Sequence, residues 1–464
     1  MQYYFSDFIF IILKIILEQK LSPTFSSRLF YLFTSLVRVG LKVIKPHIKI
    51  YDNYKVVSII KKKYYKNKCF LNNYIVYISI QSIKIIQQMF PSSIIISDFL
   101  NNEITQNQKY CLLFSQFLLE EDYLEKINKE INNFYNYRSN DGWILSNEQI
   151  PLVNDYKINP DNFIEVEKLI NKDSYCLLVD QKMLGANWGA VFGLMNNKKI
   201  KEIESYLDKK YKKIDFVKET KKVLDISIKL SDEEKIIAEF WAGGKTTVTP
   251  PGFWIMFLYC YFKNNRRNNL TQVDYFYKLS CALFQASIIV WKIKYKYLQC
   301  RPIQSIRLNF PNKNFNYYFG DCTGDLWLPY QELNFLTPPF PDYISGHSTF
   351  SSAGACILNN LLGKNISKLN IKITTDELKM LSPLFNNYPQ KIYNLNKITI
   401  NKDCSNIQNN VPKNKIVLSF NNWDFMAENA GVSRIFGGIH IQSSNLYGLY
   451  TGKFVSYYIL NKIM

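Results

Sequence analysis

The spacing of apolar and polar residues along the chain predicts a mostly helical protein. Apolar positions recur at helical spacing in residues 26–44 ("SSRLFYLFTSLVRVGLKVI") and 116–137 ("QFLLEEDYLEKINKEINNFYNY"). Residues 273–299 are nearly all apolar with scattered polar positions, a pattern typical of a long helix that is buried on most sides. Small and apolar residues in 347–362 and 445–460 predict two further helices that pack closely.

Local signals place several helix ends. Ser231 and Glu234 have the spacing of a capping box, and Gly243 lies where the helix that follows them is expected to stop. Two prolines in "TPPGFWIMFLYCYF" (249–262) are typical of the first turn of another helix. Because Pro302 disfavours helical geometry in the residue before it, the long helix is expected to end near Arg301.

Strand signals are confined to "NKITI" (396–400) and "KIVLSF" (415–420). Both lie in residues 363–421, which are rich in Asn and Lys and interrupted by prolines, so this part of the chain is interpreted as a surface insertion with a short hairpin. The predicted fold class is therefore all-α, a helical bundle.

Three regions are expected along the 464 residues. Residues 1–110 form an N-terminal helical region of unknown role, residues 111–230 form a helical region that packs on the core, and residues 231–464 form the catalytic bundle. The sequence does not decide whether the protein forms an oligomer.

The composition narrows the class of partner. The formal net charge is +19, but the lysines are interleaved with Asn, Ile and Tyr throughout the chain, which indicates a coding bias rather than a nucleic-acid surface. We therefore expect no nucleic-acid partner. A basic chain is nevertheless compatible with a small anionic ligand.

The cysteines and the first apolar run bear on location. The nine cysteines are odd in number and dispersed, with no C-x-x-C pair, which argues against a disulfide framework or a zinc site and mildly favours a reducing, cytoplasmic compartment. "FIFIILKIIL" (8–17) is too short to span a bilayer and is interrupted by Lys14, so we interpret it as a packed helix rather than a signal peptide. No membrane span is expected.

Three short segments carry candidate chemistry, and each also has an ordinary structural reading. Ser345 and Gly346 in "ISGH" either cap a helix or form an anion-binding corner beside His347. Lys294 and Arg301, seven residues apart, either form a solvated stripe or project from one helix face towards a single anion.

The third segment is "SRIFGGIH", residues 433–440. Arg434 and His440 flank two glycines that permit a turn, so both side chains can reach one point, although a lone histidine is more often a core residue. Of the three histidines, two lie in such Gly, Ser and Arg contexts, and only His47 is left over.

Together, "KYKYLQCRP", "ISGH" and "SRIFGGIH" resemble the three-part signature of the superfamily of vanadium-dependent haloperoxidases and type 2 phosphatidic acid phosphatases. The longer segments "EFWAGG", "TVTPPGFW" and "PFPDYISGHSTFS" are more similar to the haloperoxidase branch. The resemblance covers roughly residues 231–464.

The resemblance implies a vanadate cofactor, with phosphate able to occupy the same site, and the substrates hydrogen peroxide, halide and a small organic molecule. It implies that His440 is the protein ligand of the metal, that His347 acts as acid and base, and that Lys294 polarises bound peroxide. The residues expected to bind the oxyanion are Lys294, Arg301, Ser345, Gly346, Arg434 and His440.

Phe340 and Trp291 are expected to line the halide pocket. In the resembling family, the position of Phe340 is often His in bromide-selective members and Phe in chloride-competent ones. We therefore expect bromide and iodide oxidation, with chloride oxidation as a further hypothesis.

The chain departs from the family pattern in one place that matters. Gly243 replaces a residue that is often acidic in relatives, and this leaves open what orients Arg301 and Arg434; Glu239, Asp321 and Asp325 are the alternatives. An acid phosphatase with a phosphohistidine intermediate remains the second hypothesis, since it needs nearly the same residues. A non-catalytic helical protein is disfavoured because every recognised catalytic position is filled.

Overall fold

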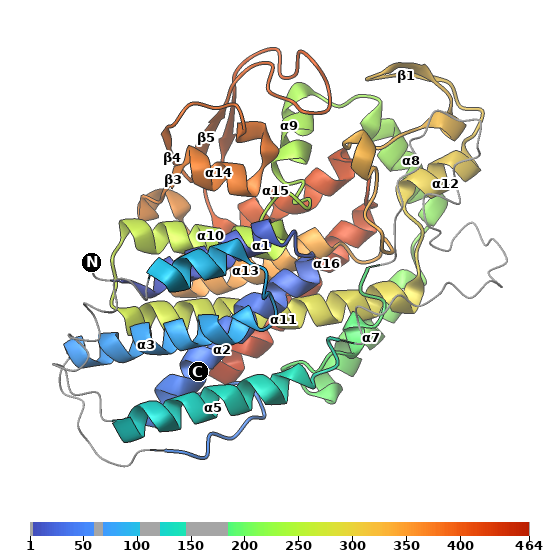
Figure 1. The fold of residues 1–464 in the computed structure, drawn as a ribbon. Helices are drawn as coiled ribbons and strands as arrows, with labels where there is room; N and C mark the ends of the chain where they lie inside the picture. The colour runs from blue at the N-terminus through green and yellow to red at the C-terminus, as the bar shows by residue number, and fades with distance from the viewer. Residues whose placement is uncertain (1–2, 60–67, 103–120, 145–183, 464) are drawn as a thin grey trace.

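The computed structural model describes residues 3–59, 68–102, 121–144 and 184–463 (Figure 1). Within these residues the chain is mostly helical, which confirms the predicted all-α fold class. The principal helices are α1 (Phe5–Glu18), α2 (Pro23–Ile44), α3 (Lys68–Gln87), α5 (Glu121–Ser139), α7 (Asn197–Tyr211), α8 (Phe216–Ser227), α9 (Asp232–Phe240), α10 (Thr249–Asn264), α11 (Asn269–Tyr297), α12 (Pro302–Asn309), α13 (Gly346–Leu362), α14 (Thr375–Leu381), α15 (Trp423–Phe436) and α16 (Gln442–Ile463).

Helix α11 is the centre of the bundle, with α2, α13 and α16 packed around it (Figure 1). It is the one helix among the described residues that is long and apolar enough to cross a membrane by length and composition, and 89% of its most apolar window is buried inside the protein. A core helix of a soluble bundle has the same properties.

The N-terminal helices share the core of the C-terminal half. Phe5 of α1 stacks on Phe33 of α2 at 5.6 Å between ring centroids, and one continuous hydrophobic cluster extends from Phe5 to Leu460. The first N–H groups of α1 donate to side chains of α11, namely Asn269 (2.8 Å) and Gln272 (2.8 Å). These contacts satisfy donors that a helix start leaves unpaired, so α1 is the packed helix that its apolar run predicts. The division into three regions stays a prediction.

Strands are more numerous than predicted. The two expected strands are present as β5 (Lys397–Ile400) and β6 (Ile416–Ser419). The expectation that strands are confined to them is wrong, because four further short strands occur: β1 (Phe315–Tyr317), β2 (Gly320–Cys322), β3 (Lys372–Thr374) and β4 (Ile392–Asn394). Each of the four has only three residues, too few for an alternating pattern to be recognised in sequence.

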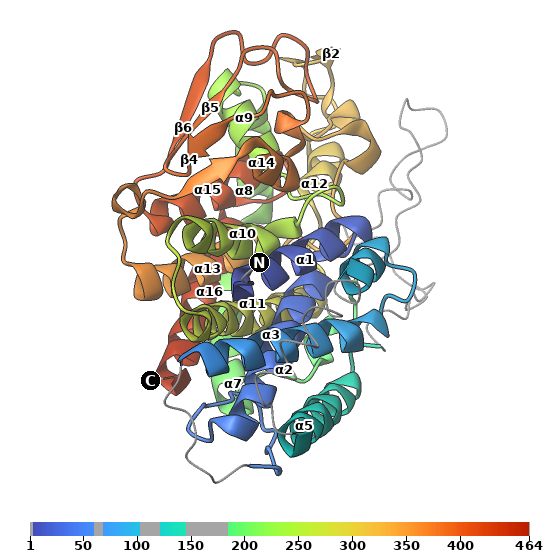
Figure 2. The same cartoon turned by 60° about the vertical axis from the view of Figure 1, so that its left-hand side comes forward.

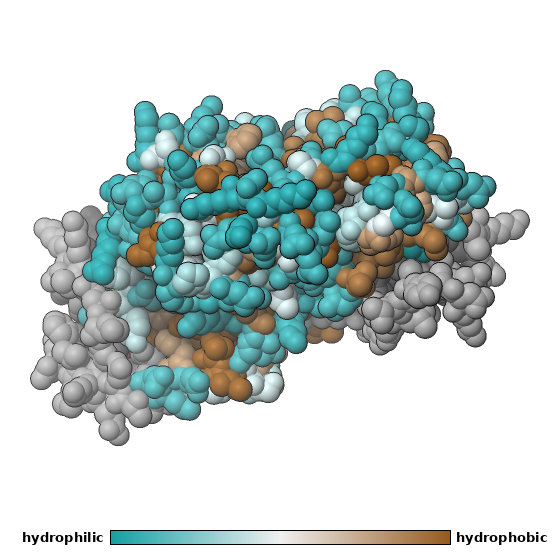
Figure 3. Space-filling view, turned by 90° about the horizontal axis from the view of Figure 1, so that it is seen from above, coloured by the Kyte–Doolittle hydropathy of each residue, from teal (hydrophilic) through white to brown (hydrophobic). Residues whose placement is uncertain are grey.

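The strands form two antiparallel sheets. Strands β1 and β2 form a two-stranded hairpin, and β3-β4-β5-β6 form a four-stranded sheet in that order, with Ile398 opposite Leu418. The four-stranded sheet and helix α14 lie in residues 363–421, at one end of the molecule, and α5 lies at the other (Figures 1 and 2). Seen from the sheet end, the surface is largely hydrophilic with scattered apolar groups (Figure 3).

Helix ends follow the sequence signals with one exception. The capping box of Ser231 and Glu234 is present at the start of α9, and α10 begins with its two prolines. The expectation that Lys294 and Arg301 share a helix face is wrong. Helix α11 ends at Tyr297, followed by Leu298 in the left-handed region (φ 50°), and Arg301 is the N-cap of the next helix, α12.

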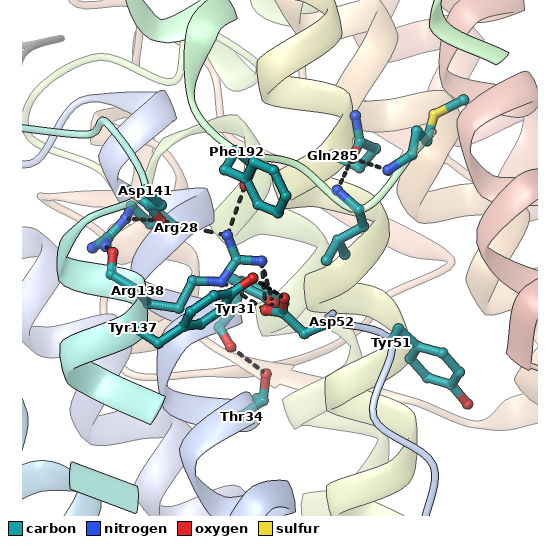
Figure 4. Close-up of polar contacts among 12 residues, drawn as sticks. Arg28, Tyr31, Thr34, Tyr51, Asp52, Tyr137, Arg138, Asp141, Phe192 and Gln285 are labelled. Carbon is teal, nitrogen blue, oxygen red and sulfur yellow. Dashed lines mark hydrogen bonds and ion pairs between the residues drawn. The ribbon is translucent and has the colours of Figure 1, made fainter. Parts of the chain in front are cut away.

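A buried cluster of charged side chains joins the N-terminal elements (Figure 4). Arg138 of α5 donates through Nε to Asp52 at 2.6 Å, and Arg28 of α2 pairs with Asp141 at 3.2 Å. All four side chains are at most 3% exposed. Because two cations balance two carboxylates, the cluster has no net charge. It connects α2, α5 and the segment around Asp52.

Candidate active site

Three basic side chains that are expected to bind an anion are fully buried. Lys294, Arg301 and Arg434 are 0%, 1% and 0% exposed. Nζ of Lys294 donates to the carbonyl oxygens of Pro341 (2.7 Å) and Asp342 (2.8 Å). Although they lie on different helices, Lys294 and Arg301 therefore converge on one segment, since Nε of Arg301 donates to the carbonyl of Phe340, the residue before Pro341, at 2.9 Å.

Backbone and hydroxyl oxygens, rather than carboxylates, orient the two arginines. Nη1 of Arg301 donates to the carbonyl of Ile439 at 2.7 Å. Arg434 donates from Nε to the hydroxyl of Ser433 at 3.0 Å and from Nη2 to the carbonyl of Ala238. Nη2 of Arg301 is buried and has no hydrogen-bond partner among the described residues.

None of the three carboxylates suggested by the sequence pairs with these arginines within the described chain. Glu239 accepts hydrogen bonds from Tyr330 (3.1 Å), Ser405 and the N–H of Asn406 (2.8 Å). Asp321 accepts from Asn316 in the β1–β2 hairpin, and Asp325 is exposed. The expectation that one of them replaces an acidic residue at position 243 is therefore not confirmed by a contact within the described residues.

The carboxylate that does lie in the site is Asp342, which the sequence reasoning missed. One oxygen of Asp342 contacts Nδ1 of His440, and both side chains are at most 2% exposed. The other oxygen accepts from the N–H of Ile441 at 3.4 Å. A signal was available in "PFPDYISGH", because Asp342 is an acidic residue that directly follows a proline and lies three positions before the Ser-Gly-His motif.

The contact with Asp342 defines the tautomer of His440. A carboxylate accepts hydrogen bonds, so Nδ1 donates and Nε2 keeps its lone pair. Burial lowers the pKa of His440 well below its ordinary value, and Arg301, Lys294 and Arg434 lower it further. His440 is thus a neutral imidazole, and its Nε2 lies 3.2 Å from Nη1 of Arg301.

The start of α13 contributes neutral groups. Ser345 is the N-cap, and its oxygen accepts from the N–H of Ser348 at 3.3 Å, which leaves its hydroxyl proton free to donate. Gly346 is the first helical residue, where backbone N–H groups and the positive end of the helix dipole favour an anion. The N–H of Ser345 donates to the carbonyl of Ser444 at 3.0 Å and so fixes this corner to α16.

His347 lies in the first turn of α13. Its Nε2 donates to the carbonyl of Trp241 at 2.9 Å, so Nδ1 carries the lone pair. Burial lowers the pKa of His347 well below its ordinary value, with Arg434 and His440 adding to the effect. Gly243 lies against this ring: its φ is +62°, and a Cβ there would meet His347 Nε2 at 3.0 Å. The glycine therefore leaves room for the histidine.

Phe340 and Trp291 form an aromatic wall beside the cations. Their ring centroids are 4.9 Å apart, and the Phe340 ring lies 5.1 Å from Nζ of Lys294 and 5.0 Å from the guanidinium of Arg301. Trp291 also lies near Gly346, at 3.6 Å from the position of a Cβ. The two residues expected at a halide pocket thus adjoin both the cations and the α13 corner.

The charges in this site are unbalanced. Among the described residues, three buried basic groups are gathered here with one carboxylate, that of Asp342, which interacts with Arg301 and Lys294. Burial lowers the pKa of Arg301 to about 10 and of Arg434 to about 9, and it lowers that of Lys294 well below its ordinary value. Burial also raises the pKa of Asp342 to about 6, although Arg301 and Lys294 oppose this. A bound anion would favour the charged form of all three basic groups.

The fold and these side chains define a helical protein in which three buried basic side chains and two histidines are gathered in one place. Residues 274–464 match the family described as the VCPO second helical-bundle domain. The chain is similar to the crystal structure of a bacterial vanadium-dependent iodoperoxidase, with a TM-score of 0.68 and 17% identity. The match covers 99% of this chain and 95% of the iodoperoxidase chain.

Two structures of a bacterial vanadium-dependent chloroperoxidase are also similar. The match to the holo form covers 96% of this chain and 93% of the chloroperoxidase chain, with a TM-score of 0.61 and 15% identity. The match to the apo form covers 96% of this chain and 95% of the chloroperoxidase chain, with a TM-score of 0.61 and 13% identity. No curated protein matches by sequence. The resemblance to vanadium haloperoxidases is confirmed, and the chain has their helical fold.

Proposed function

We propose that the protein is a vanadate-dependent haloperoxidase that uses hydrogen peroxide to oxidise halide to hypohalous acid, which then halogenates organic compounds. The observation that carries this proposal is the burial of Lys294, Arg301 and Arg434 around His440 with, among the described residues, one carboxylate. Burying three cations is costly unless an anion offsets their charge.

The pocket fits a tetrahedral oxyanion such as vanadate or phosphate. Within the part of the chain that the structure describes, Nη2 of Arg301 is a donor without an acceptor, and Ser345 and Gly346 add neutral donors. Nε2 of His440 would be the metal ligand, since Nδ1 is engaged by Asp342. When bound, vanadate would supply the Lewis-acidic centre at which peroxide becomes an oxidant for halide.

The chain's own residues would handle protons and position the reactants. His347 would accept a proton from hydrogen peroxide at Nδ1 and return it to a leaving oxygen, while its Nε2–H stays bonded to Trp241. Lys294, held by two carbonyls, would point a fixed positive charge at a peroxide oxygen. Phe340 and Trp291 would keep water away from the halide.

A phosphomonoesterase is the second candidate, and the contact between Asp342 and His440 favours it. A carboxylate that holds Nδ1–H leaves Nε2 as a nucleophile able to attack phosphorus, and His347 would protonate the leaving alcohol. The same pocket would bind phosphate, so the two reactions would use the same residues.

The test incubates purified full-length protein with orthovanadate, hydrogen peroxide and iodide or bromide, and in parallel with p-nitrophenyl phosphate without vanadate. We expect vanadate-dependent formation of triiodide and bromination of a dye, with inorganic phosphate acting as a competitive inhibitor. Phosphate release without vanadate-dependent halide oxidation would favour the phosphatase, and neither activity would contradict both.

A further inference from the structure

A second cavity, of about 520 Å³, lies where α2 meets the start of α11. Its wall is formed by α2, by the segment that follows α2 and by the first three turns of α11. Lys278 in this wall and Lys294 of the candidate active site both lie on α11, about 24 Å apart along the helix axis at about 1.5 Å per residue. The cavity is therefore separate from the candidate active site. We call it the Arg38 cavity.

Two cations in this wall share one carboxylate. Asp274 accepts through one oxygen from Nη1 of Arg38 at 2.9 Å, and its other oxygen lies 2.8 Å from Nζ of Lys278. The side chains of Arg38 and Lys278 are 9% and 20% exposed, so both are largely removed from water. Nε of Arg38 also donates to the carbonyl of Lys49 at 2.6 Å, which fixes the guanidinium. Asp274 thus holds two like charges side by side.

The charges of the wall are not balanced. Lys49 is exposed at the rim and adds a third cation, whereas Asp274 is the one carboxylate among the described lining residues. Three cations against one carboxylate leave two excess positive charges when His47 is neutral. The buried cluster around Arg138 differs, because its two cations face two carboxylates (Figure 4). The excess charge of the Arg38 cavity therefore favours an anionic ligand.

The rest of the wall suits an organic group beside the anion. Leu41, Ile48 and Val273 are buried apolar residues of the wall, and Tyr275 is partly buried. The volume lies in the range of cavities that bind small organic molecules, so inorganic phosphate would leave most of it empty. The first turn of α11 also belongs to the wall, and the helix dipole favours negative charge there.

We propose that the Arg38 cavity binds a small organic phosphate, with its phosphate group beside Arg38 and Lys278 and its organic group on the apolar part of the wall. A phosphate monoester carries about −1.5 to −2 charges at neutral pH, which matches the excess charge of the wall. A monocarboxylate would leave one cation unbalanced. Lys278 has three N–H donors and uses one on Asp274, so it can donate to a phosphate oxygen as well.

The first test titrates the full chain with phenylphosphonate by isothermal calorimetry. This probe is a phosphate analogue whose phosphorus–carbon bond a phosphomonoesterase does not hydrolyse. We expect a binding event that Lys278→Gln weakens about tenfold or more, because it removes one of the two cations. Leu270→Trp, which fills the cavity without changing its charge, should weaken the same event. Lys292→Gln is the matched control, since it removes another lysine of α11 that pairs with a carboxylate, Glu204 at 3.6 Å, outside the cavity.

The variants also separate this cavity from the candidate active site. Phenylphosphonate that binds at the active site should do so equally in all of them, so the event that the cavity variants weaken belongs to the Arg38 cavity. Lys49→Gln changes an exposed side chain and should also weaken that event, which keeps the test valid if another variant does not fold. Equal affinities in wild type, Lys278→Gln, Leu270→Trp and Lys49→Gln would overturn the proposal.

The second test measures selectivity for the class of ligand. At mildly alkaline pH we expect phenylphosphonate to bind about tenfold more tightly than benzoate, with the difference reduced in Lys278→Gln and unchanged in Lys292→Gln. Raising the salt concentration should weaken binding, since the rim of the cavity is exposed. Benzoate that binds in the cavity as tightly as phenylphosphonate would overturn the phosphate class. Inorganic phosphate that binds there as tightly would overturn the role of the organic group.

Discussion

Nδ1 of His440 is in hydrogen-bond contact with the carboxylate of Asp342, and both side chains are removed from solvent. The backbone carbonyl of Asp342 also accepts from Lys294. One residue therefore connects the candidate metal ligand with the candidate peroxide-polarising cation, through different atoms. This arrangement makes Asp342 a positioning residue for both.

The first prediction follows from that position. Asp342→Asn should lower vanadate affinity by about 10- to 100-fold, because the amide no longer fixes the tautomer and orientation of His440. Equilibrium dialysis with elemental analysis of vanadium measures the affinity independently of turnover. Asp321→Asn, in an exposed hairpin, is the matched control. Wild-type affinity in Asp342→Asn would show that this contact does not support the ligand.

The second prediction separates the two histidines of the candidate site. His440→Ala should abolish retention of vanadate, whereas His347→Ala should retain part of the binding and lose about 100-fold or more in halide oxidation, since only a proton carrier is removed. His47→Ala changes the one exposed histidine and should behave as wild type. Vanadium content after gel filtration and steady-state rates of triiodide formation give the two readouts. Equal loss of vanadate in both variants would contradict the division of roles.

Much of the fold was predictable because its signals are local. The capping box before α9 and the prolines of α10 specify helix starts, and the apolar run of α11 specifies burial. The end of α11 was not predictable, because Leu298 adopts a left-handed conformation that usually requires glycine or asparagine. That early end places Arg301 on the next helix.

The candidate site was predictable as a list of residues but not as a set of contacts. The motifs name the cations and histidines, yet nothing in their spacing shows that backbone carbonyls orient Arg301 and Arg434. Asp342 was missed because a side chain that acts on another residue 98 positions away leaves no periodic signal in a single sequence. Glu239, considered as a partner for the arginines, instead lies in the wall of a cavity of about 570 Å³.

The third prediction concerns pH and stability. Burial raises the pKa of Glu239 from 4.5 to about 7. The folded state therefore binds more protons than the unfolded state between these values, and stability falls as the pH rises through this window. Glu239→Gln removes the titration, so its free energy of unfolding should increase relative to wild type by about 3 kcal/mol between pH 4.5 and 8. Urea unfolding at several pH values measures this difference. The exposed Glu332→Gln is the control, and parallel pH profiles for wild type and Glu239→Gln would be inconsistent with the shift.

The fourth prediction concerns the buried charged cluster in Figure 4. Asp52→Ala should destabilise the protein by about 3–5 kcal/mol, because it leaves Arg138 buried without its nearest carboxylate. Asp122→Ala removes an exposed pair with Lys126 and should cost under about 1 kcal/mol. Urea denaturation of both variants provides the comparison. Similar small losses would mean that Asp141 alone is sufficient to balance Arg138.

The last prediction concerns the choice of halide, and it rests on Phe340. The ring of Phe340 packs on Trp291 and lies about equally far from Lys294 and Arg301, so it shields the cations from water. A less hydrated pocket should favour oxidation of chloride, the more strongly hydrated halide, relative to a polar pocket. Phe340→His should therefore reduce the rate with chloride more than the rate with bromide, by about 1–3 kcal/mol in the ratio of kcat/KM values, the usual effect of one small group. Rates with chloride, bromide and iodide at mildly acidic pH measure it, and Phe425→His, an exposed phenylalanine of α15, controls for the added histidine. If wild type oxidises bromide but not chloride and Phe340→His leaves the bromide rate unchanged, Phe340 does not determine which halide is used.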